Sequence, residues 1–193
     1  MEDISSFIPE QSLSTISRWI DEYKCTIIIS NTRKTKLGDF RASYKEKNYI
    51  ITVNKDLNKY AFLITLTHEI AHMMVWETYQ NNVKAHGKEW KEMFKKLMIG
   101  LIHVFPYDIQ KCLAKHLKNP RASTTSDYML SKTLRKHDKN TALTISDIPI
   151  GSVFSTSNGK KYIKGRKIRT RFQCELLENK KIYLFNPLTE VQI

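Results

Sequence analysis

The five residues HEIAH at positions 68–72 lie inside a long apolar segment, and the interpretation of the whole chain starts from them. Apolar side chains recur at helical spacing on both sides, which predicts a long helix opened by Asn54–Asn58. Residues four apart lie on one face of a helix, so His68 and His72 would stack about one turn apart. Glu69 would lie about 100° round the same helix, out of line with the two imidazoles.

Two imidazoles in this arrangement can bind one tetrahedral zinc ion at about 2.0–2.1 Å. Glu69 need not be a ligand, and it can accept a proton from a zinc-bound water that the metal has made more acidic. The alternative is a pair of hydrogen-bonded core histidines with Glu69 at the surface. Burying two unligated imidazoles and a carboxylate in so apolar a helix is costly. The pattern therefore predicts that His68 and His72 bind zinc and that Glu69 is catalytic.

A catalytic zinc site needs a third protein ligand and keeps one position open. Glu92 is one candidate, at about the distance from the second histidine that gluzincins use, and Glu89 is a weaker version of the same idea. Both glutamates can equally form a solvated face paired with neighbouring lysines. His86 is the other candidate, followed by Gly87, which permits a close backbone approach, and by Trp90, which can lock the next helix. We expect His86 to be the third ligand.

The remaining elements are predicted from periodicity and from turn residues. Four further helices are expected at residues 9–23, 86–101, 106–117 and 127–137. Strands are expected at 25–30, 38–44 and 49–53, the last two joined by a charged turn at 45–48. From residue 144 onward, turn signals at 158–159 and 179–180 separate short alternating runs, which predicts a small antiparallel sheet.

These elements predict an α+β chain. A mostly helical, zincin-like metalloprotease domain with a small sheet would be followed by a small antiparallel β module. The expected boundaries are 1–120 for the metalloprotease domain, 121–142 for a basic linker with a helix, and 143–193 for the β module.

Hydrophobic residues make up 41% of the 193 residues, enough for a core and too many for wholesale disorder. The N-terminus lacks the apolar stretch of a signal peptide, and no apolar run is long enough to span a bilayer. Cys25, Cys112 and Cys174 lie far apart, so neither a disulfide framework nor a cysteine zinc ribbon is expected. We expect a monomer in the reducing cytoplasm, with no membrane partner.

The net charge of +13 is concentrated in the second half of the chain. Residues 1–100 hold 15 Lys and Arg against 12 Asp and Glu, whereas residues 101–193 hold 17 against 7. Such asymmetry favours a nucleic acid as partner, and the alternative is a basic surface that only keeps the protein soluble. Seven cations crowd one segment of the expected β module and are candidate phosphate contacts: Lys160, Lys161, Lys164, Arg166, Lys167, Arg169 and Arg171.

Two aromatic residues, Tyr162 and Phe172, are interleaved with these cations and could stack on bases of single-stranded DNA. The alternative places both rings in the core of the β module, and for Phe172 the alternation of the strand favours that alternative.

The two-part motif, HEIAH at 68–72 followed by HGKEW at 86–90, resembles the SprT family. Gly38–Arg41 and the strand at 50–53 are similar to the segments that precede the family's active-site helix, and the resemblance covers about residues 10–120. It implies a compact, mostly helical metalloprotease with zinc bound by His68, His72 and His86, and Glu69 as the catalytic residue. Spartan-like members degrade proteins crosslinked to DNA and depend on DNA binding, so single-stranded or junction-containing DNA and a protein substrate are the expected partners.

The chain departs from the family in one respect. Many SprT proteins carry a cysteine-rich zinc ribbon after the protease unit, which Cys112 and Cys174 alone cannot build, so one catalytic zinc is expected. Two other functions stay open. One is a regulatory protease of the ImmA/IrrE kind that cuts a repressor and whose third ligand is normally acidic. The other is a DNA-binding protein whose zinc is only structural.

Overall fold

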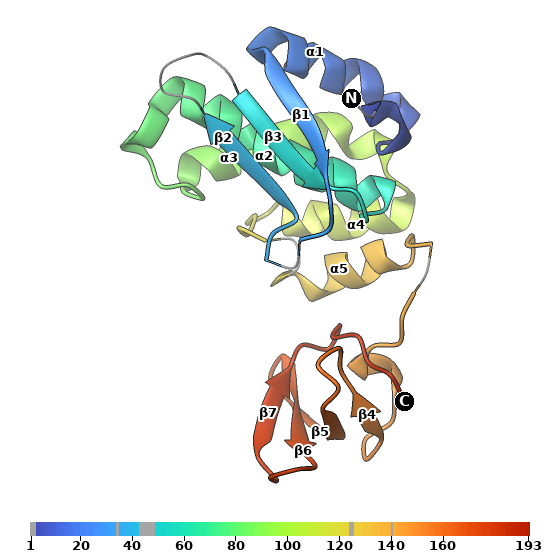
Figure 1. The fold of residues 1–193 in the computed structure, drawn as a ribbon. Helices are drawn as coiled ribbons and strands as arrows, with labels where there is room; N and C mark the ends of the chain where they lie inside the picture. Colours follow the sequence, from blue (N-terminus) through green and yellow to red (C-terminus); the bar gives the residue numbers. More distant parts are fainter. Residues whose placement is uncertain (1–2, 34, 43–48, 124–125, 140) are drawn as a thin grey trace. The chain divides into compact units, whose positions relative to one another are not determined.

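The computed structural model describes residues 3–33, 35–42, 49–123, 126–139 and 141–193. Its helices and strands form an α+β arrangement, which confirms the predicted fold class (Figure 1). The chain divides into two compact units, Met1–Asp138 and Lys139–Ile193, each with its own hydrophobic core.

Helix α2 (Lys59–Tyr79) runs through the core of the first unit. Asn58 caps its N-terminus, because the side-chain oxygen accepts hydrogen bonds from the backbone N–H groups of Tyr60 and Ala61 at 3.1 and 3.0 Å. Twelve of its residues are buried, and they are distributed round the helix, as expected when neighbours cover it on most sides. The HEIAH sequence is therefore held on the most enclosed helix of the unit.

A three-stranded sheet packs against α2. Strand β1 (Cys25–Ser30) pairs in parallel with β3 (Tyr49–Asn54), and β2 (Gly38–Ala42) pairs antiparallel with the other side of β3. The order β1-β3-β2 leaves β2 as an edge strand, and β2 and β3 both contact α2. Figure 1 shows the strands lying across α2, with α1 (Leu13–Tyr23) beside β1.

Three further helices complete the first unit: α3 (Lys88–Leu101), α4 (Tyr107–His116) and α5 (Tyr128–Arg135). Trp90, Phe94 and Met98 of α3 are fully buried, and α3 packs against α2. Helix α5 packs against α4, and its Leu130 and Leu134 belong to the core of this unit. The segment expected as a linker therefore contributes a helix to the first unit.

The second unit is a four-stranded antiparallel sheet in the order β4-β5-β6-β7. Its strands are β4 (Val153–Ser155), β5 (Lys161–Ile168), β6 (Arg171–Leu176) and β7 (Ile182–Phe185). Four of the buried residues of its core are Phe154, Tyr162, Cys174 and Leu176. The predicted turn signals hold, since Gly159 and Lys180 adopt positive φ values of 75° and 60° between strands.

The differences from the expected elements lie at the element ends. The first helix begins at Leu13 after a 3₁₀ turn at Glu10–Ser12, and the helix expected from residue 86 begins at Lys88. The charged turn expected at 45–48 lies outside the described residues. Within the part of the chain that the structure describes, no helix is both long and apolar enough to cross a membrane.

Candidate metal centre

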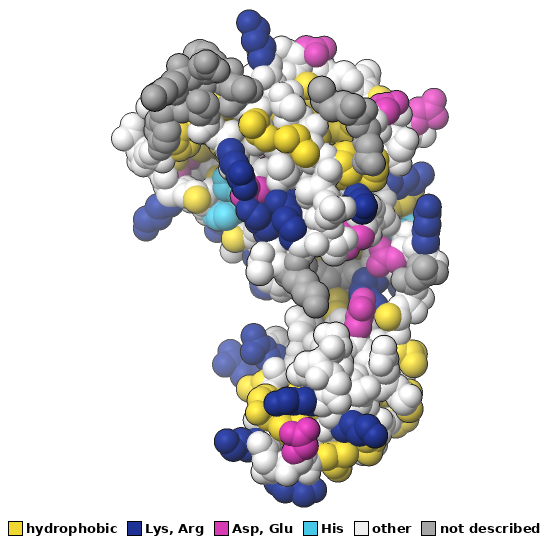
Figure 2. Space-filling view, in the orientation of Figure 1, with side chains coloured by type: hydrophobic (Ala, Val, Ile, Leu, Met, Phe, Trp, Pro, Cys, Tyr) yellow, Lys and Arg dark blue, Asp and Glu magenta, His cyan; other side chains and the backbone are white. Residues whose placement is uncertain are grey.

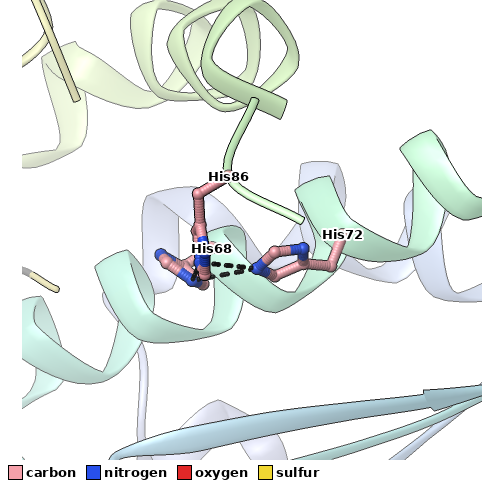
Figure 3. Close-up of side chains that lie close together, drawn as sticks. All are labelled: His68, His72 and His86. Carbon is pink, nitrogen blue, oxygen red and sulfur yellow. Dashed lines mark hydrogen bonds between the residues drawn. The ribbon is translucent and has the colours of Figure 1, made fainter. Parts of the chain in front are cut away.

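Three histidine side chains point one nitrogen each at a common centre (Figure 3). His68 and His72 project from one face of α2, and His86 reaches them from the loop before α3. The Nε2–Nε2 distances are 3.2 Å between His68 and His72, 3.0 Å between His72 and His86, and 3.2 Å between His68 and His86. Among the described residues, these are the only His, Cys, Asp or Glu side chains that converge in a group of three.

The triangle of nitrogens suits a bound cation. Metal–nitrogen bonds of about 2.0–2.1 Å at tetrahedral angles separate ligand atoms by about 3.3 Å, slightly more than the distances here. The three nitrogens cannot all form hydrogen bonds with one another, because each hydrogen bond needs one donor and one acceptor. Among three mutual contacts, at least one joins two donors or two acceptors. A cation that accepts all three lone pairs removes this conflict. The three histidines could therefore hold a metal ion and leave one tetrahedral position open.

The surroundings keep these imidazoles neutral, which is the form that binds metal. Burial and the neighbouring imidazoles lower the pKa of His68 to about 3 and that of His72 to about 4. Burial also lowers the pKa of His86. The donor set is thus deprotonated at physiological pH.

The Trp90 side chain contacts the rings of all three histidines. Its ring stacks on His72 with centroids 5.4 Å apart and contacts His68 and His86 at 4.5 and 4.8 Å. Its indole N–H points at the carbonyl of His68, 3.4 Å away. Because Trp90 is fully buried and stacked on Phe94, α3 fixes the loop that carries His86.

Glu69 follows His68 on α2 and is buried, with 8% of its surface exposed. Burial and the nearby Asp39 raise the pKa of its carboxyl to about 7, although Arg33, Lys36 and a hydrogen bond from the Phe40 backbone act in the opposite direction. A bound metal cation would favour the carboxylate and bring the pKa back down. Glu69 is therefore a sheltered carboxyl beside the three histidines.

Edge strand β2 holds Glu69 in place. Gly38 lies so close to α2 that an added Cβ would be 2.7 Å from Glu69 Oε1 and 2.9 Å from Thr65 Cγ2. Two residues further along β2, the backbone of Phe40 makes a hydrogen bond to the carboxyl. The absence of a side chain at Gly38 is what allows this strand to approach the helix.

His68, His72, His86 and Glu69 line one cavity of about 520 Å³. Strand β2 lines it, together with the end of α2 and the loop that leads to His86. Figure 2 shows histidine side chains reaching the surface of the first unit, with Lys or Arg side chains close by. The volume of this cavity lies within the range that is usual for ligand-binding pockets.

The two glutamates considered as ligands lie elsewhere. Glu92 has a side chain that is 68% exposed and pairs with Lys88 at 3.9 Å. Glu89 is not part of the group of three histidines. Its carboxylate lies beside Gly87, where an added Cβ would be 3.1 Å from Glu89 Oε2. The structure brings His86, and neither glutamate, to His68 and His72.

Six of the seven cations considered as phosphate contacts are exposed on β5, β6 and the adjoining turns: Lys160, Lys161, Arg166, Lys167, Arg169 and Arg171. The β5–β6 connection is tight, with Arg169 at a positive φ of 52°. This arrangement places several positive charges on one hairpin of the second unit.

Lys164 and Tyr162 depart from the expectation that they face a nucleic acid. Lys164 is 4% exposed, donates a hydrogen bond to the Ile148 carbonyl at 2.6 Å and lies 4.1 Å from the Phe172 ring centroid. Tyr162 is 3% exposed and stacks on Phe154 in the core. Both side chains point into the unit because alternate residues of β5 share one face.

Sequence reasoning missed the close contact of β2 with α2. Gly38 and Phe40 fall in a segment that is predicted as a strand and that resembles the family, without a role for either residue. A glycine at the start of an otherwise ordinary strand was the available signal, because it often marks a close backbone approach.

Comparison with known proteins gives one match. The model of the SprT-like family matches residues 10–110, which is more than half of the chain and includes all three histidines and Glu69. Neither the curated proteins nor the solved structures gave a match.

Proposed function

Since the chain belongs to the SprT-like family, we propose that it is a zinc-dependent endopeptidase that cuts proteins bound or crosslinked to DNA. One observation carries the proposal. The Nε2 atoms of His68, His72 and His86 converge within 3.0–3.2 Å of one another, and buried Glu69 lines the same cavity. Three ligands and an adjacent carboxyl are the components of hydrolytic metal sites.

Zinc is the proposed metal, because three neutral imidazoles with an open fourth position form a ligand set that catalytic zinc sites use. When bound, zinc supplies a Lewis acid that polarises a carbonyl group and makes water more acidic. His68, His72 and His86 hold it through their Nε2 atoms. Trp90 keeps the three rings in position by packing beneath them.

Glu69 is the proposed general base. Its carboxylate accepts a proton from the attacking water and then delivers this proton to the leaving amine. Burial excludes competing solvent, and the hydrogen bond from the Phe40 backbone fixes the carboxylate toward β2. Glu69→Gln removes the base and preserves the shape of the side chain, so it separates catalysis from metal binding.

DNA association is proposed for the second unit. Its 55 residues include ten Lys and Arg against four Asp and Glu, counted over residues 139–193. The six exposed cations around β5 and β6 could neutralise several phosphates of single-stranded or junction-containing DNA. Binding of this kind brings the peptidase to its substrates without requiring a preferred sequence at the cut bond.

The experiment that tests the substrate class uses the zinc-loaded chain and a protein crosslinked to DNA, with and without added single-stranded DNA. We expect cleavage that DNA stimulates. Cleavage that ignores DNA would support a peptidase with a repressor-type target, and no cleavage by zinc-bound protein would support a structural zinc.

A further inference from the structure

A second cavity, of about 440 Å³, adjoins the metal centre in the first unit, and His86 lines both cavities. The start of α3 and the residues that end and follow α4 form its walls. Four lysines line this cavity, namely Lys88, Lys91, Lys95 and Lys118. We refer to the cavity as the lysine groove. No step of the proposed hydrolysis uses this groove.

The charges of the lysine groove are poorly compensated. Among the described residues that line it, Glu92 alone is acidic. Glu92 and Lys88 are 3.9 Å apart with side chains 68% and 82% exposed, so solvent screens this pair strongly. Lys91 donates its hydrogen bond to a neutral group, Asn119 Oδ1, at 2.9 Å. The groove therefore keeps a net positive charge.

The lysines form a row. Lys88, Lys91 and Lys95 are three and four residues apart, which places them on one face of α3. At 1.5 Å per residue they span about 10 Å along the helix. Lys118 extends the row onto the opposite wall. A row of charges of this length suits a charged polymer better than a single small anion.

We propose that the lysine groove binds the phosphate backbone of a nucleic acid beside the metal centre. Lysine contacts phosphate as a point charge, whereas bidentate recognition of planar carboxylates favours arginine, and no arginine is among the described lining residues. No Phe, Tyr or Trp side chain is among them either, so the groove recognises charge and not base identity. The net charge of +13 favours the same polyanion.

Nucleic acid in the lysine groove would lie against His86, and a protein attached to it would be close to the cavity that contains Glu69. The inference extends the proposed function. Its test measures binding by the zinc-loaded chain without any cleavage, so its failure and the failure of the proposed peptidase activity are distinguishable.

The test measures fluorescence anisotropy of a labelled oligo-dT at several salt concentrations with the full-length, zinc-loaded chain. The groove variant is Lys95→Glu with Lys118→Glu. The matched control, Lys55→Glu with Lys59→Glu, makes the same change in net charge at exposed lysines outside the groove. Zinc content and thermal unfolding show whether both variants fold.

We expect the groove variant to bind oligo-dT at least about tenfold more weakly than the control, and to reduce the slope of log K against log salt by about 1.4 for two lost phosphate contacts. Equal losses of oligo-dT affinity in the two variants would show that only total charge matters and would overturn the proposal. Unchanged oligo-dT binding together with weaker binding of a labelled glutamate-rich peptide would also overturn it, because the groove would then be a peptide subsite.

Discussion

Gly38 and Glu69 are in such close contact that a single methyl group at Gly38 would lie 2.7 Å from Glu69 Oε1. The same methyl group would be 2.9 Å from Thr65 Cγ2, one turn earlier on α2. Edge strand β2 and helix α2 therefore meet at the Glu69 carboxyl. The position of the Glu69 carboxyl depends on Gly38, a residue that has no side chain.

Replacing Gly38 by Ala should displace Glu69 and lower kcat by about 10- to 100-fold, since small misplacements of a catalytic group cost this much. Zinc affinity should be unchanged, because the three histidines are untouched. Gly100→Ala is the matched control, since no atom lies within 4 Å of the added Cβ there. Steady-state kinetics and zinc titration of both variants make the measurement. Equal kcat values for Gly38→Ala and the wild type would contradict the role given to this contact.

His86→Ala should weaken zinc binding by at least about 100-fold, because loss of even an outer partner of a metal ligand costs 10- to 100-fold. Glu92→Ala should leave the affinity within about twofold, as its side chain is 68% exposed and lies outside the converging group. Competition with a chromophoric chelator measures both affinities. If Glu92→Ala weakened zinc binding more than His86→Ala, the third ligand would be Glu92, and an ImmA/IrrE-type protease would be favoured.

Trp90→Ala should lower the free energy of unfolding by about 3–5 kcal/mol, the usual cost of removing a fully buried aromatic side chain. It should also weaken zinc binding, because the indole packs under all three imidazoles. Trp90→Phe keeps part of this platform and should lose less of both. Urea unfolding of the zinc-free and zinc-loaded forms separates the two effects, and a destabilised variant with unchanged zinc affinity would limit Trp90 to packing.

Asp127 caps α5 and should contribute pH-dependent stability. Burial raises the pKa of its carboxyl, but hydrogen bonds from the Leu130 backbone and the His116 ring outweigh burial and lower it. A group with a lowered folded pKa stabilises the fold above its unfolded pKa of about 3.9, and this stability is lost as the pH falls below that value. Asp127→Ala should cost about 1 kcal/mol at pH 7, and Asp127→Asn, which preserves the cap, should cost less.

The check is chemical unfolding at pH 7 and at pH 3. The difference between wild type and Asp127→Ala should shrink at the lower pH. A difference that stays constant would show that only the geometry of the cap matters and that the charge contributes nothing.

Charge reversal at Arg166, Lys167 and Arg169 should weaken DNA binding and reduce its salt dependence, because these exposed side chains follow one another at the β5–β6 connection. Three lost phosphate contacts would lower the slope of log K against log salt by about 2 on single-stranded DNA. The control reverses Lys24, Lys55 and Lys59, which are exposed on the first unit. Anisotropy titrations in which both triple variants behave alike would count against the hairpin as a DNA contact.

The parts predicted from sequence are those that local spacing determines. The four-residue separation of His68 and His72 predicted their stacking, since the helix that carries them is specified by its own apolar pattern. His86 was expected from its neighbours Gly87 and Trp90, and the contacts of Trp90 with all three rings give the physical basis of that expectation.

The parts that were missed depend on tertiary packing. Gly38 meets Glu69 only because β2 lies at the sheet edge against α2, and local spacing does not encode that pairing. Lys164 was treated as exposed because of its charge, yet it shares the inward face of β5 with Tyr162. The alternation of β5 accounts for its direction, and the Ile148 carbonyl and Phe172 ring make its burial possible.

We propose that His68, His72 and His86 bind a metal that works with Glu69 to hydrolyse peptide bonds. The most direct measurement compares the wild type with Glu69→Gln, loaded with equal zinc, on a protein crosslinked to DNA in the presence of single-stranded DNA. We expect that the wild type cleaves, that Glu69→Gln binds one zinc per chain and does not cleave, and that a chelator abolishes wild-type activity. Equal cleavage by the two forms, or none by zinc-loaded wild type, would contradict it.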